Sequence, residues 1–263
     1  MALKFRNIFH PEAALIKQDD DAIIKRFSKL FPKLVDKMAA AKLSESAIES
    51  KITYDLITED DKEQVLKLLK ATFFQDEPLN RCVELGECKD LEIYCTKSIS
   101  DGCSYKAVNG DGEIIGVFLN GIIKKPTADM TPCSLASSTD HPKFKKIMSL
   151  MDYVDSKFNI FALYPDIDLF VDGKILAVDS KYRGHGIAGH LTDKTIENLR
   201  LRKIPIFSIL CSSHFSARVC EKMGFEEVFQ LPFEDFVDDE GKPVLCPEKP
   251  HVSVRIFIRK ILQ

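Results

Sequence analysis

The segment from Leu176 to Leu191 is a strong candidate for ligand binding. An apolar, strand-like stretch runs into a turn of small residues, and a helical pattern begins there. Glycines at 184, 186 and 189 would let an anionic group approach the backbone, and the N–H groups of a helix start would bind it. The alternative is a tight turn in which glycine supplies a positive φ without any ligand. On this pattern alone, both interpretations stay open.

Two common phosphate-binding motifs do not fit this segment. The chain has no Gly-Lys-Ser/Thr sequence, which excludes a P-loop. Gly184, Gly186 and Gly189 match Gly-x-Gly-x-x-Gly, but the next predicted strand, 206–211, runs into Ser-Ser and offers a ribose no carboxylate. Five residues, 179–183, also separate the preceding strand from the first of these glycines. A dinucleotide site is therefore disfavoured.

The second candidate for chemistry is the carboxylate pair Asp76-Glu77. Phe73 and Phe74 precede it and Pro78-Leu79 follows, so the setting is partly apolar. Such a setting brings a carboxyl pKa toward neutrality, which suits a general base. The alternative is an ordinary solvated helix end.

Two serines, Ser212 and Ser216, lie four residues apart across a predicted junction between a strand and a helix. Their hydroxyls could cap the helix, donate hydrogen bonds to a leaving group, or do both.

The elements that must position these residues alternate between strands and helices. Asn109-Gly110-Asp111-Gly112 predicts a hairpin turn, and Gly224 predicts a helix end. The order of the elements predicts a mixed α/β fold. Strands are predicted at 52–57, 105–108, 114–123, 175–178, 206–211 and 252–258, and helices at 63–74, 89–98, 143–158, 188–202 and 216–223.

Residues 1–50 differ from the rest of the chain. They contain no glycine, and apolar residues recur at helical spacing between lysines, with Pro32 as a break. The segment could bind a membrane surface or a partner protein, or it could be an extension that frays or packs on the domain, which we favour. We therefore expect an N-terminal extension over 1–50, partly helical or mobile, and one domain over 52–263.

The composition excludes several classes of protein. The 263 residues include 37 basic and 40 acidic side chains, for a net charge of −3, whereas nucleic-acid binders are strongly basic. No apolar stretch is long enough to cross a bilayer, and no signal peptide opens the sequence. The eight cysteines form no Cys-x-x-Cys pair, which disfavours zinc and favours reduced thiols in the cytoplasm. We expect a cytoplasmic monomer with no metal, membrane or nucleic-acid partner.

Two motifs, each following one of two successive strands, resemble the GNAT superfamily of acetyl-CoA-dependent N-acetyltransferases. Arg183-Gly184-His185-Gly186-Ile187-Ala188 is similar to the family's pyrophosphate loop, and residues 220–225 are similar to its helix ending in Gly-Phe. Segments 73–80, 103–108 and 210–219 narrow the resemblance to the insect arylalkylamine N-acetyltransferases, over roughly residues 52–263. The fold that this implies is α/β, with a mostly antiparallel central sheet, one splayed pair of parallel strands, and flanking helices.

The resemblance implies acetyl-CoA as co-substrate, Glu77 as general base, and Ser212 and Ser216 as donors to the leaving thiolate. Cys220 stands where many GNAT enzymes carry a tyrosine acid, which puts that variant of the mechanism in doubt. An amine pocket should be apolar and aromatic, with a charge partner. The expected cofactor-binding residues are Leu176, Ala177, Val178, Arg183, Gly184, His185, Gly186, Ile187, Ala188 and Gly189. The expected amine-binding residues are Phe73, Asp76, Tyr94, Phe118 and Asp172.

The leading hypothesis is acetyl transfer to arylalkylamines, with dopamine, tyramine, octopamine, serotonin and tryptamine as candidate substrates. The resemblance implies a role in amine inactivation and cuticle sclerotization in an insect. One alternative is acetylation of agmatine or polyamines, which an acid-lined pocket would favour. Another is an inactive acyl-CoA-binding module that serves interactions, against which Glu77 and Ser216 count.

Overall fold

The computed structural model describes residues 52–127 and 134–261. The chain divides into two units, Met1–Lys51 and Ile52–Gln263. The predicted N-terminal extension, residues 1–50, lies outside the described residues, and the fold below is that of the second unit.

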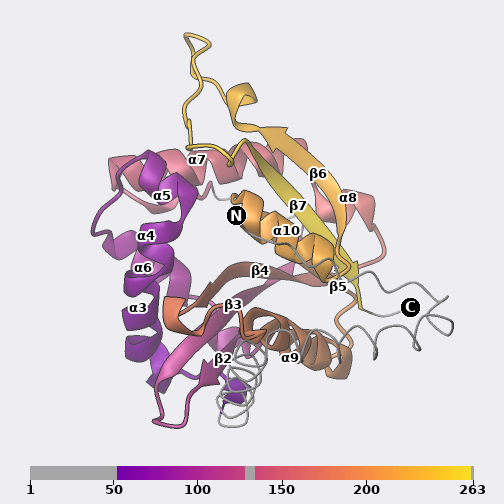
Figure 1. Cartoon of the computed structure of the whole chain (residues 1–263). Helices are drawn as coiled ribbons and strands as arrows, with labels where there is room; N and C mark the ends of the chain where they lie inside the picture. Colours follow the sequence, from indigo (N-terminus) through magenta and orange to yellow (C-terminus); the bar gives the residue numbers. More distant parts are fainter. Residues whose placement is uncertain (1–51, 128–133, 262–263) are drawn as a thin grey trace, which may run out of the picture. The chain divides into compact units, whose positions relative to one another are not determined.

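A mixed sheet forms the centre of this domain (Figure 1). Within the described ranges it has seven strands in the order β1-β2-β3-β4-β5-β7-β6. Neighbouring strands are antiparallel except for β4 and β5, which are parallel. This arrangement confirms the predicted fold class. The strands are β1 Thr53–Leu56, β2 Tyr105–Val108, β3 Ile114–Lys124, β4 Leu169–Val178, β5 Ile206–Cys211, β6 Glu226–Pro232 and β7 Ser253–Lys260.

The parallel pair opens before its two strands end. The last paired residues are Gly173 on β4 and Ile209 on β5, although β4 continues to Val178. Over that continuation β4 remains paired with β3 on its other side. The backbone groups at the end of β4 that point away from β3 therefore have no strand partner in the described part of the chain.

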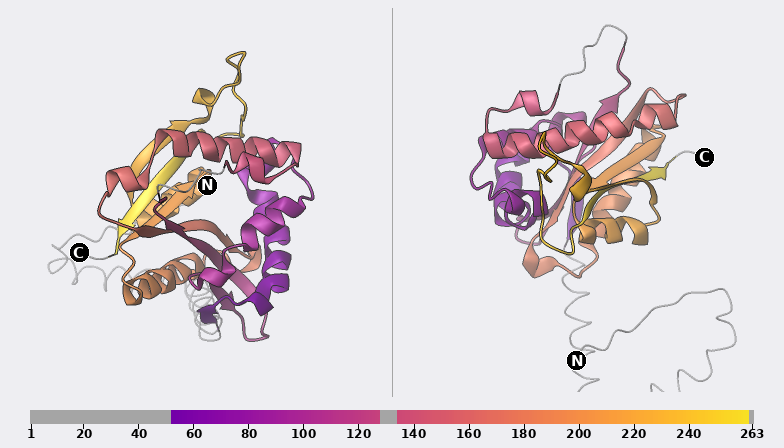
Figure 2. Two further views of the ribbon diagram at one scale, coloured as in Figure 1. Left: turned by 180° about the vertical axis from the view of Figure 1, so that it is seen from behind. Right: turned by 90° about the horizontal axis from the view of Figure 1, so that it is seen from above.

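Helices cover both faces of the sheet (Figures 1 and 2). One hydrophobic cluster joins β3 and β4 to the helices on the first face, and a second cluster joins the sheet to α9 and α10 on the other face. The helices of the first face are α3 Lys62–Ala71, α4 Phe73–Asp76, α5 Pro78–Cys82, α6 Lys89–Thr96 and α7 Pro142–Lys157. A short helix, α8 Ile160–Leu163, follows α7, and the second face carries α9 Ile187–Leu201 and α10 His214–Lys222.

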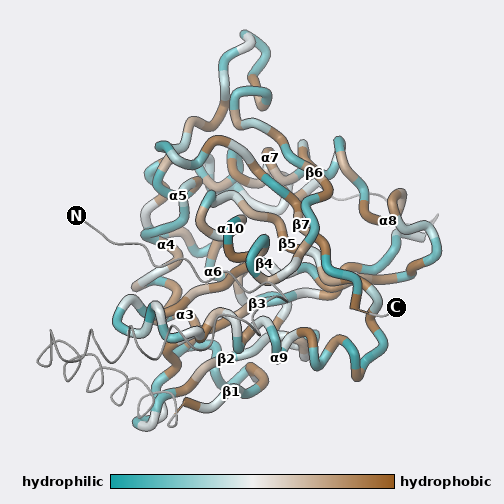
Figure 3. The backbone as a smooth tube through the Cα atoms, turned by 45° about the vertical axis from the view of Figure 1, so that its right-hand side comes forward, coloured by the Kyte–Doolittle hydropathy of each residue, from teal (hydrophilic) through white to brown (hydrophobic). Residues whose placement is uncertain are grey.

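The two clusters follow from the alternation of side chains along each strand. On β3, Val117 and Leu119 belong to the first cluster, whereas Phe118 between them belongs to the second. Successive residues of a strand point to opposite faces, so a strand covered on both sides is apolar throughout. Figure 3 shows hydrophobic residues along the central strands and hydrophilic residues in the loop that projects at the top of the view.

Several elements differ from the sequence predictions, among them the short helices α5 and α8, which were not predicted. β4 begins at Leu169 rather than 175, because its first half contains Asp172 and Lys174, which break the apolar run. β6 was not predicted, since its sequence EEVFQLP starts with two charged residues, as is common at a sheet edge. The predicted helix 63–74 is interrupted at Thr72, whose backbone is not helical (φ −130°, ψ −85°).

Candidate active site

Glu77 lies at the break between α4 and α5. Its backbone is extended, and Pro78 occupies the first position of α5, where its fixed φ is suitable. The carboxylate caps the helix by accepting the Asn80 N–H at 2.6 Å. The Ser212 hydroxyl, just beyond the end of β5, donates to the other carboxylate oxygen at 2.7 Å. Contacts from two segments far apart in the sequence therefore fix the Glu77 side chain.

The Glu77 carboxyl is buried, with a relative exposure of 9%. Burial raises its pKa, because the charged form loses solvation. The hydrogen bonds from Ser212 and from the backbone of Asn80 and Leu79 oppose this shift, but the pKa remains above the usual value for glutamate. Such a group binds a proton more readily than an exposed glutamate, which is a property of a general base.

Glu77 and Ser212 lie on the wall of a cavity of about 640 Å³. The cavity lies on the first face of the sheet, between β4 and β5 on one side and helices α4 to α7 on the other. Aliphatic and aromatic side chains form most of its wall, which suits the organic part of a small ligand. Its aromatic residues are Phe73, Tyr94, Phe144, Phe158, Phe161 and Phe170.

The other end of the cavity carries charges of both signs. Asp172 and Lys174 lie on β4, Asp155 on α7, and Lys97 just after α6. Lys174 Nζ donates to the Ser98 hydroxyl at 2.7 Å, and Lys97 Nζ is 4.8 Å from the centre of the Tyr94 ring.

These charges alter one another's protonation. Burial raises the pKa of Asp172 to about 6, although the neighbouring Lys174 lowers it. Burial and the nearby charge of Lys174 lower the pKa of Lys97. Both groups therefore have a weaker preference for the charged form than in water.

The strand register gives the separation of two residues on the cavity wall, Asp172 and Ser212. Asp172 is paired with Ser208 on β5, and Ser212 lies four residues further along the same chain segment. At a rise of ~3.3 Å per residue, Asp172 and Ser212 are about 13 Å apart along the strand direction. The cavity is long enough for a small aromatic amine that contacts both ends.

The structure brings several predicted site residues together. Phe73, Tyr94 and Asp172 line the same cavity as Glu77 and Ser212. Sequence reasoning missed Asn80, Asp155, Lys97 and Lys174, which also line it. Lys174 could have been recognised, because it lies two residues from the predicted Asp172 in an apolar strand and so shares its face.

Phe118 does not lie in this cavity. It is 1% exposed, belongs to the cluster on the other face of the sheet, and packs against Phe207 with ring centres 5.6 Å apart. The prediction that it contacts the amine does not fit this position, because alternation along β3 directs it toward α9.

Asp76 also lies outside the cavity wall. It is exposed, and its carboxylate accepts Arg183 Nη2 at 2.7 Å. Arg183 Nε donates to the carbonyl oxygen of Val178 at 3.1 Å. This ion pair connects the residue next to the candidate base with the glycine-rich turn.

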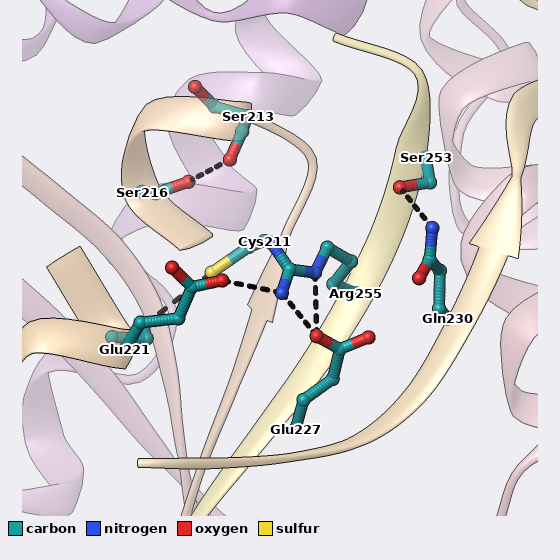
Figure 4. Close-up of polar contacts among 9 residues, drawn as sticks. Cys211, Ser213, Ser216, Glu221, Glu227, Gln230, Ser253 and Arg255 are labelled. Carbon is teal, nitrogen blue, oxygen red and sulfur yellow. Dashed lines mark hydrogen bonds and ion pairs between the residues drawn. The ribbon is translucent and has the colours of Figure 1, made fainter. Parts of the chain in front are cut away.

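Ser216 lies on α10, and its hydroxyl donates to the Ser213 carbonyl oxygen at 3.0 Å (Figure 4). The pKa of the nearby Cys211 thiol is lowered by hydrogen bonds, first from Cys220 and then from Ser216. Nearby, Arg255 binds Glu221 and Glu227 and so joins α10, β6 and β7 (Figure 4). The catalytic role of Ser216 stays a prediction.

The glycine-rich turn has the conformation that only glycine adopts readily. Gly184 and Gly186 have φ of +92° and +74°, and Gly186 begins α9 without a side chain that could cap it. A Cβ atom added at Gly184 or Gly189 would meet no described residue within 4 Å. The space beside these two glycines is therefore open at the start of a 15-residue helix, which fits an anionic group.

The remaining predicted cofactor residues adjoin this turn. Leu176, Ala177 and Val178 form the end of β4, where the strand has left β5. Ile187 is buried in the second cluster. His185 is half-buried, and the exposed His190 ring lies 5.3 Å from Tyr54. The open strand edge and the turn are thus joined in the chain by the short segment 179–183.

No helix in residues 52–127 and 134–261 is long and apolar enough to cross a membrane. In the same ranges, no three His, Cys, Asp or Glu side chains are grouped as ligands for a metal ion.

Several solved structures have a similar fold. No protein-family model matches the chain. Among solved structures, it is similar to arylalkylamine N-acetyltransferase 2 from Aedes aegypti, with 30% identity, coverage of 80% of this chain and 99% of that one, and a TM-score of 0.75. Two others show the same fold, each with a TM-score of 0.70 and the same coverage: a mosquito arylalkylamine N-acetyltransferase like 5b at 22% identity and a Drosophila melanogaster polyamine N-acetyltransferase at 21%. The chain therefore belongs to the GNAT family of acetyl-CoA-dependent N-acetyltransferases.

Proposed function

We propose that the protein acetylates the primary amine of arylalkylamines and that Glu77 is the general base. The observation that carries this proposal is the buried Glu77 carboxylate, with its raised pKa, on the wall of an aromatic cavity. The similarity to an insect arylalkylamine N-acetyltransferase at 30% identity supports it.

Acetyl-CoA, when bound, supplies the thioester carbonyl that the amine attacks. The end of β4, Leu176–Val178, has no strand partner on the β5 side and offers backbone groups there to the pantetheine arm, and a main-chain N–H there would stabilise the developing oxyanion. The turn Arg183–Gly189 offers backbone N–H groups to the pyrophosphate.

Deprotonation of the amine is the role proposed for Glu77. An arylalkylamine is mostly an ammonium ion at neutral pH, so it must lose a proton before it can attack a carbonyl carbon. The hydrogen bonds that Glu77 accepts favour its ionised form, and its raised pKa makes it a better proton acceptor than an exposed carboxylate.

Ser212 connects this step to a second proton transfer. A hydroxyl has one hydrogen, and in the structure that of Ser212 is donated to Glu77. Once Glu77 has taken a proton, it can donate to the Ser212 oxygen instead, and the serine hydrogen is free to point elsewhere. The pair thus provides a route by which a proton gained at Glu77 makes another available for a leaving group.

Replacing Ser212 with alanine should shift the acid limb of the pH profile upward by about one pH unit. The lost hydrogen bond stabilises the ionised carboxylate, and a bond to a charged group is worth roughly 1.5–3 kcal/mol. The measurement is kcat/KM against pH at saturating acetyl-CoA. Ser213→Ala is the matched control, because that side chain caps α10 and has no hydrogen bond to Glu77. An unchanged limb in Ser212→Ala would contradict the coupling.

The cavity supports an arylalkylamine as the acceptor. Aromatic rings line its wall, and Asp172 is about 13 Å from Ser212 by strand rise. Two carboxylates and two ammonium groups at the charged end can accept and donate hydrogen bonds, which suits a neutral ring hydroxyl. Hydroxylated amines such as dopamine, tyramine, octopamine and serotonin have an amine at one end and a ring hydroxyl at the other.

The alternative acceptor is agmatine or a polyamine. Asp155 and Asp172 favour it, because both carboxylates face the cavity and would attract a second cation. Lys97 and Lys174 oppose it, since they lie at the same end and repel a guanidinium or ammonium group.

A panel of amines separates these acceptors. With acetyl-CoA at saturation, we expect kcat/KM for tyramine, dopamine and serotonin to exceed that for agmatine and spermidine by about tenfold or more, equivalent to ~1.4 kcal/mol. Faster turnover of agmatine would favour the polyamine function. If acetyl-CoA binds but no amine is acetylated, the protein is a binding module rather than an enzyme.

A further inference from the structure

The segment between β6 and β7 contacts two helices that carry site residues. We call residues 236–252 the strap. The Glu248 carboxylate pairs with Arg81 on α5 at 3.3 Å, and His251 Nδ1 accepts the backbone N–H of His214 at the start of α10 at 3.2 Å. The strap thus spans from the helix that Glu77 caps to the helix that follows Ser212.

At its contact with α5, the strap brings two cysteines together. The backbone N–H of Cys246 donates to Cys82 Sγ at 3.2 Å. Because an N–Cα bond is ~1.46 Å, the Cys246 Cα lies within about 4.7 Å of that sulfur. The two cysteines are therefore close neighbours, and rotation of the Cys246 side chain about Cα–Cβ is the movement that a disulfide between them requires.

The position of this pair is fixed, yet open to reagents. Leu245, next to Cys246, is 1% exposed and anchors the strap in the core, while Cys246 itself is exposed and Cys82 is half-buried. The pair Cys211 and Cys220 differs: its sulfurs are 3.6 Å apart, but both residues are buried. Thiol oxidation requires access of the oxidant, which distinguishes the two pairs.

We propose that Cys82 and Cys246 are an oxidative modification site, at which a small disulfide such as oxidised glutathione produces a protein disulfide that ties the strap to α5. The Cys246 thiolate attacks one glutathione sulfur and releases the other as thiolate. The Cys82 thiolate then attacks Cys246 Sγ and displaces the second glutathione. Two protein thiols are oxidised, one glutathione disulfide is reduced to two thiols, and the two protons go to the released thiolates.

The bond would restrict the unfolded chain strongly, because it joins residues 164 apart. A disulfide that closes so long a loop stabilises mainly by lowering the entropy of the unfolded state. We therefore expect the oxidised full chain to melt about 5 °C or more above the reduced one.

The test incubates the full chain with oxidised glutathione, followed by thiol titration, non-reducing peptide mass mapping and melting. The expected result is two fewer titratable thiols, a linked peptide pair containing Cys82 and Cys246, and the rise in Tm. Cys82→Ser and Cys246→Ser should each lose the link and the rise. Cys246→Ser changes an exposed side chain, so its reduced form should melt as the reduced wild type does.

Three outcomes would overturn the proposal. One is a glutathione adduct on Cys246 that persists without a link to Cys82. Another is a link between Cys211 and Cys220 in place of the expected one. The third is a rise in Tm on oxidation that remains in Cys246→Ser.

Discussion

Replacement of Glu77 with glutamine should lower kcat/KM for an arylalkylamine at neutral pH by about 10²- to 10⁴-fold, the usual contribution of a general base. Glutamine keeps the size of the side chain and can still accept the N–H of Asn80, but it cannot take the proton of the ammonium. Steady-state kinetics with acetyl-CoA at saturation give this ratio. Glu87→Gln, the same change at an exposed glutamate nearby, is the matched control and should stay close to the wild-type rate.

The pH dependence gives a second readout of the same variant. The wild-type rate should fall as pH decreases through the raised pKa of Glu77, since the base is then protonated, and Glu77→Gln should lack this limb. A rate near that of the wild type, or a limb that remains, would remove Glu77 from the mechanism.

Stability should change in the opposite direction to activity. A carboxyl whose pKa is raised by burial contributes full stability below its unfolded pKa, and this contribution is lost as pH rises through the folded pKa. At neutral pH Glu77→Gln should therefore melt at the same temperature as the wild type or higher, and the difference should shrink below the ordinary pKa of glutamate. A large fall in Tm would instead indicate that the variant fails through its fold.

Replacement of Gly184 with valine should raise the KM for acetyl-CoA by about ten- to a hundredfold, corresponding to ~1.4–2.7 kcal/mol of binding. Its φ of +92° is unfavourable for a β-branched residue, and its Cβ would enter the open space that faces the start of α9. The KM for the amine should change little, because the cavity wall does not include this turn.

Gly112 supplies the control for this variant. It has a φ of +80°, and a Cβ added there would also meet no described residue within 4 Å, but it lies in the hairpin between β2 and β3. Gly112→Val should therefore incur a similar backbone strain of about 1–2 kcal/mol, seen as a lower Tm, without a change in KM for acetyl-CoA. If the two variants change KM equally, the effect comes from stability and the turn has no special part in binding.

The sequence predicted the features that depend on neighbouring residues. β2 and β5 have the predicted bounds, and α9 begins at Ile187, one residue before the predicted start. Such features can be predicted since propensity, capping and turn chemistry operate within a few residues. Phe-Phe-Gln-Asp-Glu-Pro left two interpretations open for Glu77, a partly apolar setting and a solvated helix end, and the structure shows a buried carboxyl.

Features that depend on the pairing of distant segments could not be predicted in this way. Phe118 looks like any aromatic pocket residue in the sequence, and only the register of β3 decides which face it occupies. β7 inserts between β5 and β6, although β6 precedes it in the chain. The ion pair of Asp76 with Arg183 and the charged cavity end formed by Lys97 and Asp172 likewise join segments that no periodicity connects.

The strand order also governs how quickly the domain can fold. Phe118 pairs with Leu176 and Ile209 with Phe257, so the centre of the sheet is built from contacts between distant parts of the chain. Contacts of this kind must overcome loop-closure entropy before they stabilise the fold. We therefore expect the domain to fold in milliseconds to seconds, more slowly than a small helical bundle. The hydrogen bond between Ser212 and Glu77 joins residues 135 apart. It can form only after the sheet has closed, so the Glu77 carboxylate receives the Ser212 hydrogen bond at a late stage of folding.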